Sequence, residues 1–242
     1  MEGPSLVILK EELSFLKGRR ITGSSGVVNI PYDELINQKV TNILSHGKQF
    51  FIQLNTPTIR IHFLMFGSYR LNEEKDRPPK LSLEFGNDVL NLYACSVKLL
   101  HENPSDLYDW TSDVMSDLWS ERKARNKLKK QPNTNVGDAL LDQNIFAGVG
   151  NIIKNEVLYR IQVHPDSNIG SLPPRKLGTL IREARQFSFE FYNWKKIYQL
   201  RKHLSIYKKK KCRRCNLPVL IDHTGKTPRL SFFCANCQHV YN

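Results

Sequence analysis

Long apolar runs are missing from this sequence. The longest stretches, such as Leu6–Leu9 and Phe63–Phe66, have four residues, far short of the ~18 that a membrane-spanning helix needs, and the mean hydropathy is −0.43. Acidic Glu2 comes ahead of any apolar stretch, which is the wrong order for a secretory signal with its basic leader. We therefore expect a cytosolic protein with no membrane partner.

Acidic residues are also few. The chain has 23 Asp and Glu against 36 Lys and Arg, which gives a formal charge of +13 and a pI near 9.6. A cytosolic surface this basic favours a nucleic-acid partner, because Lys and Arg that contact phosphates release condensed counterions. A merely soluble cationic surface is the less favoured alternative.

The familiar catalytic motifs are absent. The sequence has no G-x-S-x-G, no phosphate loop ending in Gly-Lys-Ser/Thr and no H-E-x-x-H. Gly148-Val149-Gly150-Asn151 offers two of the three glycines of a dinucleotide site, but Ile153 stands at the third, so we reject that function. Small residues just before a helix can still cradle a phosphate at the positive helix end. An ordinary tight turn with a helix cap fits the tetrapeptide equally well.

The sequence does contain enough apolar material for a core. It has 242 residues, 40% of them hydrophobic, which suits one large domain or two domains with a small appendage. Leucines at helical spacing predict a first helix ahead of Gly18, at Leu6, Leu9, Leu13 and Leu16. Short β-rich runs then predict the strands of a sandwich, at Val27–Ile30, Val40–Leu44, Phe50–Leu54, Ile59–Leu64, Leu81–Phe85, Val89–Ala94 and Val97–Leu100.

After about residue 104 the pattern becomes helical. We predict helical segments at Glu121–Lys130, Val136–Asp142, Asn151–Arg160 and Pro174–Trp194. The residues after the basic run Lys208–Lys211 are too few to build a core of their own.

Two C-x-x-C pairs explain how those last residues hold together. Cys212 with Cys215 and Cys234 with Cys237 have 18 residues between the pairs, a spacing typical of a four-thiolate zinc site. Two disulfides are disfavoured in a reducing compartment, and a redox pair would not be duplicated. Four thiolates close the shell, so we predict a structural zinc that leaves the protein at about +11. Cys95, in an apolar run, is predicted to be a small core residue.

Several short motifs follow one another along the chain: Met-Glu-Gly-Pro at the start, His46-Gly47-Lys48 ahead of a strand, His62–Gly67 in another, Gly148–Asn151 ahead of a helix, and Arg229 ahead of Cys234. Together with the zinc spacing, they resemble the formamidopyrimidine-DNA glycosylase/endonuclease VIII family over nearly the whole chain. The resemblance implies an α+β multidomain protein. Residues 1–110 would form an N-terminal β-sandwich catalytic domain with a leading helix, 111–205 a helix-two-turn-helix DNA-binding domain, and 206–242 a zinc-finger hairpin.

The resemblance also implies a bifunctional reaction of base-excision repair. Such enzymes extrude a damaged base, release it by attack of the N-terminal α-amine on C1′, and cleave the backbone by elimination from the Schiff base, which is the AP lyase step. An α-amine suits this chemistry, because its usual pKa of ~7.7–8.0 leaves a neutral fraction at working pH.

Catalytic roles carry over to three positions. The α-amine of Met1 would be the nucleophile, Glu2 the acid/base at the sugar ring oxygen and the lesion, and Lys48 a phosphate contact that assists catalysis. For Lys48 the alternative is a solvated strand end.

DNA-binding roles carry over to five positions. Asn151 and Arg229 would clamp the phosphates beside the extruded nucleotide, Gly148 and Gly150 would form the cradle, and Met65 would fill the space vacated in the duplex. Core packing is the alternative for Met65, and a plain hairpin charge is the alternative for Arg229.

One departure from the family leaves alternatives open. Most members begin Met-Pro-Glu and expose a proline nucleophile, whereas here Glu2 follows Met1 directly, a bulky side chain that generally blocks methionine removal. We favour a working glycosylase/lyase that uses the Met1 amine. A non-catalytic damaged-DNA-binding paralogue would explain the missing proline and Ser5, where related enzymes usually carry Glu. A zinc-ribbon RNA-binding protein would explain the charge and the cysteines but not the N-terminal motifs.

The substrate is inferred from one short segment. Tyr192–Lys211 is shorter than its counterpart in the purine-directed branch of the family, which favours oxidised pyrimidines, abasic sites or single-stranded lesions. We expect the partner to be double-stranded DNA with damaged bases or abasic sites, and the protein to act as a monomer, associated with the nucleoid in a cell of bacterial type.

Overall fold

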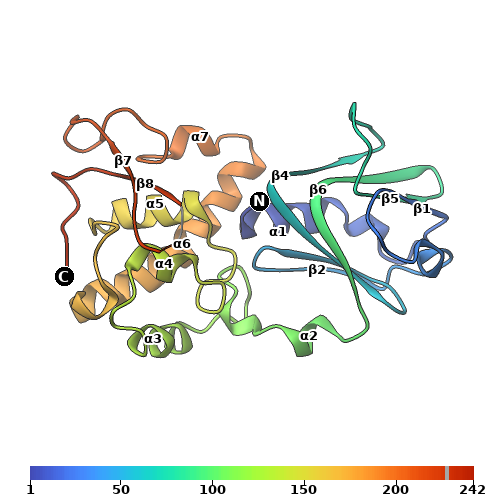
Figure 1. Ribbon diagram of the computed structural model, residues 1–242, viewed down its shortest axis with the longest axis horizontal. Helices are drawn as coiled ribbons and strands as arrows, with labels where there is room; N and C mark the ends of the chain where they lie inside the picture. Colours follow the sequence, from blue (N-terminus) through green and yellow to red (C-terminus); the bar gives the residue numbers. More distant parts are fainter. Residues whose placement is uncertain (227–228) are drawn as a thin grey trace. The chain divides into compact units, whose positions relative to one another are not determined.

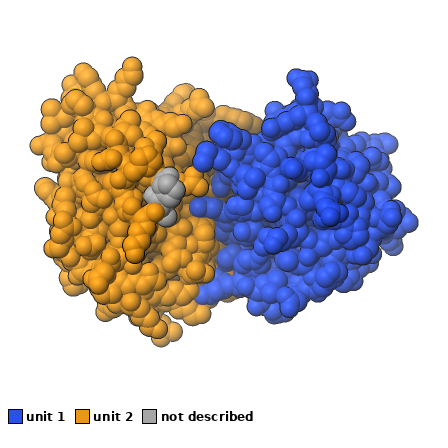
Figure 2. Space-filling model, viewed as in Figure 1, with its two compact units in different colours: residues 1, 5–109 blue, residues 2–4, 110–242 orange. Residues whose placement is uncertain are grey.

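The computed structural model describes residues 1–226 and 229–242, which form two compact units. Unit 1 comprises Met1 and Ser5–Asp109, and unit 2 comprises Glu2–Pro4 and Trp110–Asn242 (Figure 2). The helical segment and the four cysteines therefore belong to one unit.

Unit 1 is built on a six-stranded antiparallel sheet with strand order β1-β5-β6-β4-β3-β2 (Figure 1). The predicted N-terminal β-sandwich is confirmed. Its strands are β1 (Gly23–Ser25), β2 (Asn42–His46), β3 (Gln49–Gln53), β4 (Thr58–Leu71), β5 (Leu81–Phe85) and β6 (Asp88–Leu100). Its helices are α1 (Gly3–Glu12), α2 (Pro104–Leu107) and the 3-10 turns η1 (Ser14–Leu16) and η2 (Tyr32–Leu35).

The leading helix packs into the core of the sheet. Leu6, Leu9 and Leu13 are fully buried, and so is Leu16 in the 3-10 turn that follows. They share one cluster with side chains from the strands, as expected for apolar residues that recur on one helix face. Gly18 adopts a positive φ of 89°, a left-handed conformation that glycine adopts without strain.

Two strand predictions are wrong. Val27–Ile30 forms no strand: it follows Gly26 at φ 145°, and Val27 is 56% exposed. The second error is the division of strand β6 into Val89–Ala94 and Val97–Leu100. Ala94 takes a positive φ of 48°, but the ladder between β4 and β6 only shifts register there and does not end.

Unit 2 is a helical bundle followed by a two-stranded hairpin (Figure 1). Its helices are α3 (Glu121–Lys129), α4 (Val136–Leu141), α5 (Asn151–Arg160), α6 (Pro174–Lys196), α7 (Leu200–His203) and the 3-10 turns η3 (Trp110–Ser112) and η4 (Ile169–Ser171). The hairpin strands are β7 (Leu220–His223) and β8 (Leu230–Phe233). Within the described ranges, no helix combines the length and apolarity that a bilayer crossing demands.

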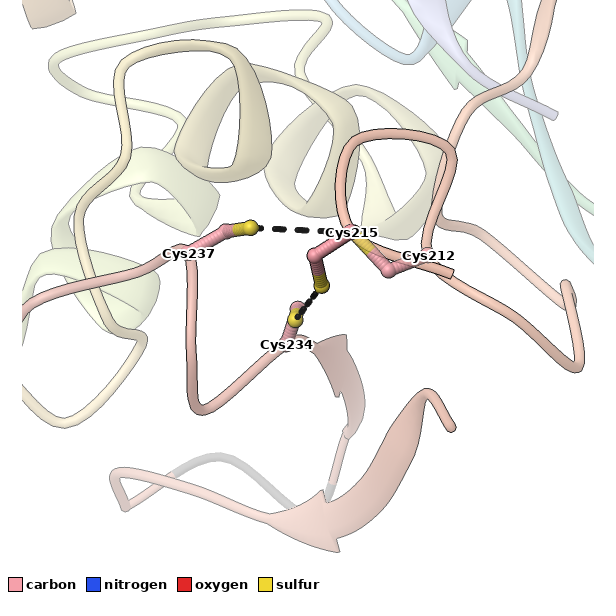
Figure 3. Close-up of side chains that lie close together, drawn as sticks. All are labelled: Cys212, Cys215, Cys234 and Cys237. Atoms are coloured by element: carbon pink, nitrogen blue, oxygen red, sulfur yellow. Dashed lines mark hydrogen bonds between the residues drawn. The ribbon is translucent and has the colours of Figure 1, made fainter. Parts of the chain in front are cut away.

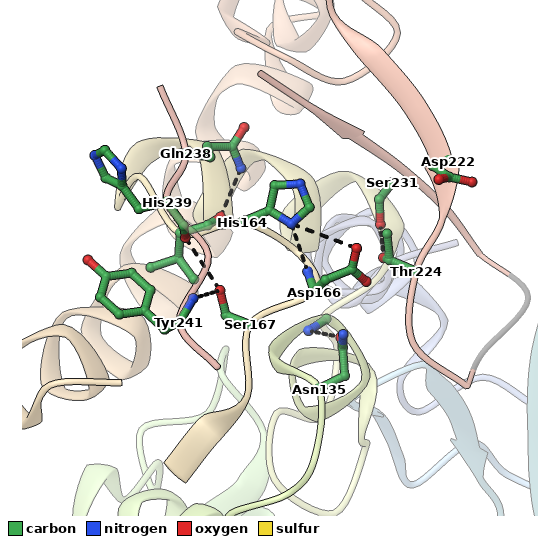
Figure 4. A network of polar contacts seen from close by, with 12 residues as sticks. Asn135, His164, Asp166, Ser167, Asp222, Thr224, Ser231, Gln238, His239 and Tyr241 are labelled. Carbon is green, nitrogen blue, oxygen red and sulfur yellow. Dashed lines mark hydrogen bonds and ion pairs between the residues drawn. The ribbon is translucent and has the colours of Figure 1, made fainter. Parts of the chain in front are cut away.

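The chain after Cys237 is fastened to the loop that follows α5 (Figure 4). The Gln238 amide donates to the Val163 carbonyl at 2.9 Å, and the His164 N–H donates to the His239 carbonyl at 2.8 Å. These bonds hold the cysteine-bearing segment against the helices.

Candidate functional site

The carboxylate of Glu2 occupies the N-terminus of helix α5. It accepts hydrogen bonds from three backbone N–H groups: Gly150 at 3.2 Å, Ile152 at 2.8 Å and Ile153 at 3.3 Å. The first N–H groups of a helix lack partners within the helix, and the helix dipole favours an anion there. A carboxylate from the start of the chain therefore caps this helix.

Gly150 makes this approach sterically feasible. A Cβ atom at this position would lie 2.4 Å from the carboxyl carbon of Glu2. The backbone angles, φ −120° and ψ −165°, are open to any residue, so the requirement for glycine comes from space alone. The Gly148 N–H donates to Oε1 of Gln143 at 3.1 Å. The glycine amides therefore serve the protein's own polar groups, and their contact with a DNA phosphate stays a prediction.

Asn151, Tyr207 and Arg229 gather next to Glu2. The Asn151 amide donates to the Leu230 carbonyl at 3.0 Å, directly beside exposed Arg229. Burial and the negative charge of Glu2 raise the pKa of Tyr207, whereas its hydrogen bond with Asn151 and the charge of Arg229 lower it. Four groups suited to phosphate and acid/base chemistry thus lie together in unit 2.

Asn151 also carries a buried acceptor. Its Oδ1 atom is shielded from solvent and accepts no hydrogen bond within the part of the chain that the structure describes. A buried polar atom of this kind calls for a donor from water or from a ligand.

A second carboxylate, which is buried, fixes the backbone at Tyr207. Glu156 is fully buried and accepts hydrogen bonds from the N–H groups of Ser205, Ile206 and Tyr207 at 2.8–3.0 Å. A charged acceptor shared by three consecutive amides fixes the local backbone. The backbone that carries Tyr207 is therefore held by a residue of α5.

Lys154 joins α5 to the hairpin strand β8. Its side chain is 1% exposed, and its ammonium donates to Oγ of Ser231 at 2.9 Å and to the Leu230 carbonyl at 3.4 Å. The pKa of Lys154 is lowered to about 8, mainly by burial. The negative charge of Asp138 raises this pKa, and the positive charge of Arg229 lowers it further. Lys154 therefore carries a buried charge close to Arg229.

Lys48 lies in the two-residue turn between β2 and β3, after Gly47 at φ 55°. The His62 Nδ1 atom lies 3.1 Å from the Lys48 carbonyl, and since a carbonyl only accepts, Nδ1 carries the proton. Burial lowers the pKa of His62, and so do the charges of the amino terminus, Lys48 and Arg60. The hydrogen bond to the Lys48 carbonyl raises this pKa by less than burial lowers it. The charges of the amino terminus and Lys48 therefore both disfavour the protonated form of His62, and all three groups belong to unit 1.

Met65 projects from an irregular part of β4. The β4–β6 ladder shifts register between Phe63 and Ser68, and the intervening residues are exposed: Leu64 50%, Met65 70% and Phe66 79%. The core-packing alternative for Met65 is therefore wrong. Its role as a wedge in the duplex stays a prediction.

The four predicted metal ligands converge (Figure 3). All four Sγ atoms lie within 4.8 Å of one another, with 3.9 Å between Cys212 and Cys237 and 3.5 Å between Cys215 and Cys234. A tetrahedral zinc with Zn–S bonds of ~2.3 Å would place its sulfurs ~3.8 Å apart. The cluster can therefore hold a metal ion, and its donor set and spacing fit zinc.

Cys95 is a core residue, as predicted. It is 5% exposed, and burial raises its pKa to about 11. A thiol in this state is protonated at neutral pH and is a poor nucleophile.

Sequence reasoning missed Lys154 and Tyr207 as members of the group around Glu2 in unit 2, and it missed His62 as the neighbour of Lys48 in unit 1. His62 was named only as part of a motif, and its alternation with buried Ile61 and Phe63 could have placed it on the other face of its strand. A lysine inside the apolar α5 was a visible anomaly. Nothing in the sequence singles out Tyr207, since its hydrogen-bond partners Glu156 and Asn151 are about 50 residues away along the chain.

Two family models match this chain. The N-terminal domain of formamidopyrimidine-DNA glycosylase matches residues 4–94, and its H2TH domain matches residues 112–187.

Curated relatives cover most of the chain. Human Endonuclease 8-like 3 is 31% identical over 249 residues, which span 93% of this chain and 41% of the relative. Endonuclease 8 2 of Mycobacterium bovis is 26% identical and covers 85% of this chain and 86% of its own length. The chain thus spans about two fifths of the length of the human relative.

Solved structures share the fold. Lactococcus lactis formamidopyrimidine DNA glycosylase, bound non-covalently to DNA containing an AP site, aligns with a TM-score of 0.87 over 98% of this chain and 99% of its own, at 21% identity. A viral DNA glycosylase aligns with a TM-score of 0.84 over 99% of this chain and the whole of its own, at 22% identity. With both domain models, the matching relatives and this fold, the chain belongs to the formamidopyrimidine-DNA glycosylase/endonuclease VIII family.

Proposed function

We propose that this protein is a base-excision-repair DNA glycosylase with AP lyase activity, which excises oxidised bases, pyrimidines above all, from double-stranded DNA. The arrangement of the first two residues carries the proposal. The charges of the amino terminus and Lys48 both act on His62, and the next residue, Glu2, is fixed by three amides at the start of α5.

The first step forms a bond between the Met1 nitrogen and C1′ of the extruded nucleotide. The bond from C1′ to the base breaks, and the base leaves with a proton. One proton of the attacking nitrogen leaves with the base. Glu2 takes the other and delivers it to the ring oxygen as the sugar opens, which gives the Schiff base. A proton is then taken from C2′ and the C3′–O bond breaks, which cleaves the strand, and water releases the protein.

The other residues position the DNA. Lys48 supplies a cation for a phosphate of the damaged strand, and Arg229 offers a planar fork that suits phosphate oxygens. Exposed Met65 fills the space left by the extruded base. Cys212, Cys215, Cys234 and Cys237 would hold a structural zinc, which contributes folding free energy to the hairpin that carries Arg229.

Borohydride trapping tests this function. A duplex with a single abasic site is incubated with the protein and reduced, and the adduct is located by mass spectrometry of its peptides. We expect a covalent adduct at Met1, none with a chain extended by Gly-Ser ahead of Met1, and strand nicking that is lost in Glu2→Gln.

A matched control separates chemistry from binding. Lys17→Gln removes an exposed cation of unit 1 outside the site and should trap as the unchanged protein does. A protein that binds the abasic duplex but gives neither adduct nor nick would instead be the non-catalytic paralogue. Tighter binding to RNA than to damaged DNA would favour the RNA-binding alternative.

A further inference from the structure

The positive charge of this protein is concentrated in one segment. Residues 195–214 hold ten Lys and Arg and no Asp or Glu, so the remaining 222 residues hold 26 Lys and Arg against 23 Asp and Glu. The segment contributes +10 of the net +13. A charge of this density needs more explanation than solubility.

The fold gathers these cations onto one surface. The Arg213 guanidinium donates to the Lys202 carbonyl at 2.8 Å, and the Lys209 ammonium donates to the Arg201 carbonyl at 3.2 Å. The run at 208–213 therefore lies against α7, and the side chains of Arg201 and Lys202 are exposed. We call residues 195–214 the basic surface.

An aromatic side chain stands in the middle of this charge. Tyr198 is 93% exposed, three residues after Lys195 and three before Arg201. Its φ of 58° is left-handed, and its N–H donates to the Lys195 carbonyl at 3.0 Å. A tyrosine held in a costly conformation and presented to solvent indicates a binding role.

The basic surface is continuous with the candidate phosphate site. Tyr207 belongs to the same segment and hydrogen-bonds through its side chain with Asn151, whose amide also donates to the carbonyl of Leu230, the residue that follows Arg229. Lys208 follows it directly and is exposed. A polynucleotide held at Asn151 and Arg229 can therefore extend along the cations of this segment.

We propose that the basic surface binds a single-stranded stretch of polynucleotide, with phosphates on Arg201, Lys202 and Lys208 and an unpaired base stacked on Tyr198. Stacking needs an open base face, which a duplex interior does not offer. A lipid surface fits less well, because α7 has only four residues and gives no apolar helix face to insert. The inference rests on the proposed function in taking DNA as the substrate.

Salt-dependent binding of an undamaged oligothymidine strand tests the cations. In Arg201→Gln/Lys202→Gln/Lys208→Gln we expect the slope of log K against log salt to become shallower by about 2, since each phosphate contact to a single strand contributes ~0.7. The matched control, Lys17→Gln/Lys39→Gln/Lys98→Gln, removes three exposed cations of unit 1 and should leave the slope nearly unchanged.

Substitution of Tyr198 tests the stacking. Tyr198→Ala should weaken binding of the undamaged strand by about tenfold, whereas Tyr198→Phe, which keeps the ring, should bind within about twofold of the unchanged protein. Fluorescence anisotropy gives both values, and thermal unfolding checks that both variants fold.

Equal slope changes in both triple variants would overturn the inference, and so would unchanged binding in Tyr198→Ala. A competition experiment is a third test. If anionic phosphatidylserine vesicles displace the strand at a lower concentration than duplex DNA does, the inference is also wrong. The proposed function fails separately. If the unchanged protein nicks no abasic duplex but the variants weaken strand binding as expected, the proposed function is wrong and the inference about the basic surface is still supported. If nicking occurs and every variant binds the strand normally, only the basic surface is wrong.

Discussion

At the scale of single residues, the contact between Glu2 and Gly150 makes a sharp prediction. Gly150→Ala should destabilise the protein by about 0.5–2 kcal/mol, the usual worth of a helix cap, because the new methyl group displaces the carboxylate. The same change in a Glu2→Ala background should cost little, since no carboxylate is left to displace. Urea unfolding of the four proteins measures this coupling. An equal cost in both backgrounds would show that the conflict lies elsewhere.

The buried ammonium of Lys154 makes stability depend on pH. Its pKa is about 8 in the folded state against 10.5 ordinarily, so between these values the unfolded chain binds more protons and the folded state gains stability as pH rises. Over that range the free energy of unfolding should rise relative to Lys154→Met by at most about 3 kcal/mol. Parallel urea titrations at pH 7.5 and 10 measure the difference, and a difference that does not change with pH would contradict a buried charge.

Individual site residues were predictable where their chemistry is local. The four cysteines follow from spacing, and the burial of Cys95 follows from its apolar neighbours. The exposure of Met65 was predictable from the family resemblance but not from the local pattern, because an apolar residue in a β-rich run is ordinarily buried and the register shift of β4 is not visible in the sequence. Tyr207 depends on contacts with Glu156 and Asn151, which no local pattern reveals.

At the scale of elements, Glu156 connects α5 to the loop that bears Tyr207. Glu156→Gln should lower the free energy of unfolding by at least about 2 kcal/mol, because an amide accepts with one oxygen only and turns a donor toward N–H groups. The exposed Glu102→Gln is the matched control and should change stability little. Thermal unfolding distinguishes the two; similar melting of both variants would refute the structural role of Glu156.

The cysteine hairpin should require its metal. Removal by a chelator leaves four sulfurs within 4.8 Å of one another without a cation, so we expect β7 and β8 to lose their structure and DNA binding to fall. Circular dichroism and anisotropy, before and after zinc is added back, check this. A metal-free protein with unchanged melting and binding would contradict a structural metal.

Elements were predictable where the hydrophobic pattern matches a local structure. Helix α5 and strand β5 have the predicted bounds, since Gly148 and Gly150 precede the helix and Gly86 and Asn87 follow the strand. Val27–Ile30 failed because two valines and an isoleucine have strand propensity but no neighbouring strand to pair with. Strand β6 was split in two because the sequence does not show that a ladder can pass through a left-handed alanine.

At the scale of the whole molecule, composition predicts the kind of partner but not the place on the molecule where the partner would bind. A charge of +13 predicts a polyanion. That ten of these charges lie in residues 195–214 was already visible in the sequence. Their assembly into one surface was not, because it depends on hydrogen bonds between the run at 208–213 and α7.

This concentration of charge has a kinetic consequence. An uneven charge distribution steers diffusing molecules, so encounters with a polyanion will begin at residues 195–214 more often than chance allows. Ionic strength should therefore act mainly on the association rate, while the dissociation rate stays nearly constant. The association rate of the polyanion would then depend on residues 195–214, which take no part in the proposed chemistry. Its dissociation rate would depend on the groups that carry out the chemistry.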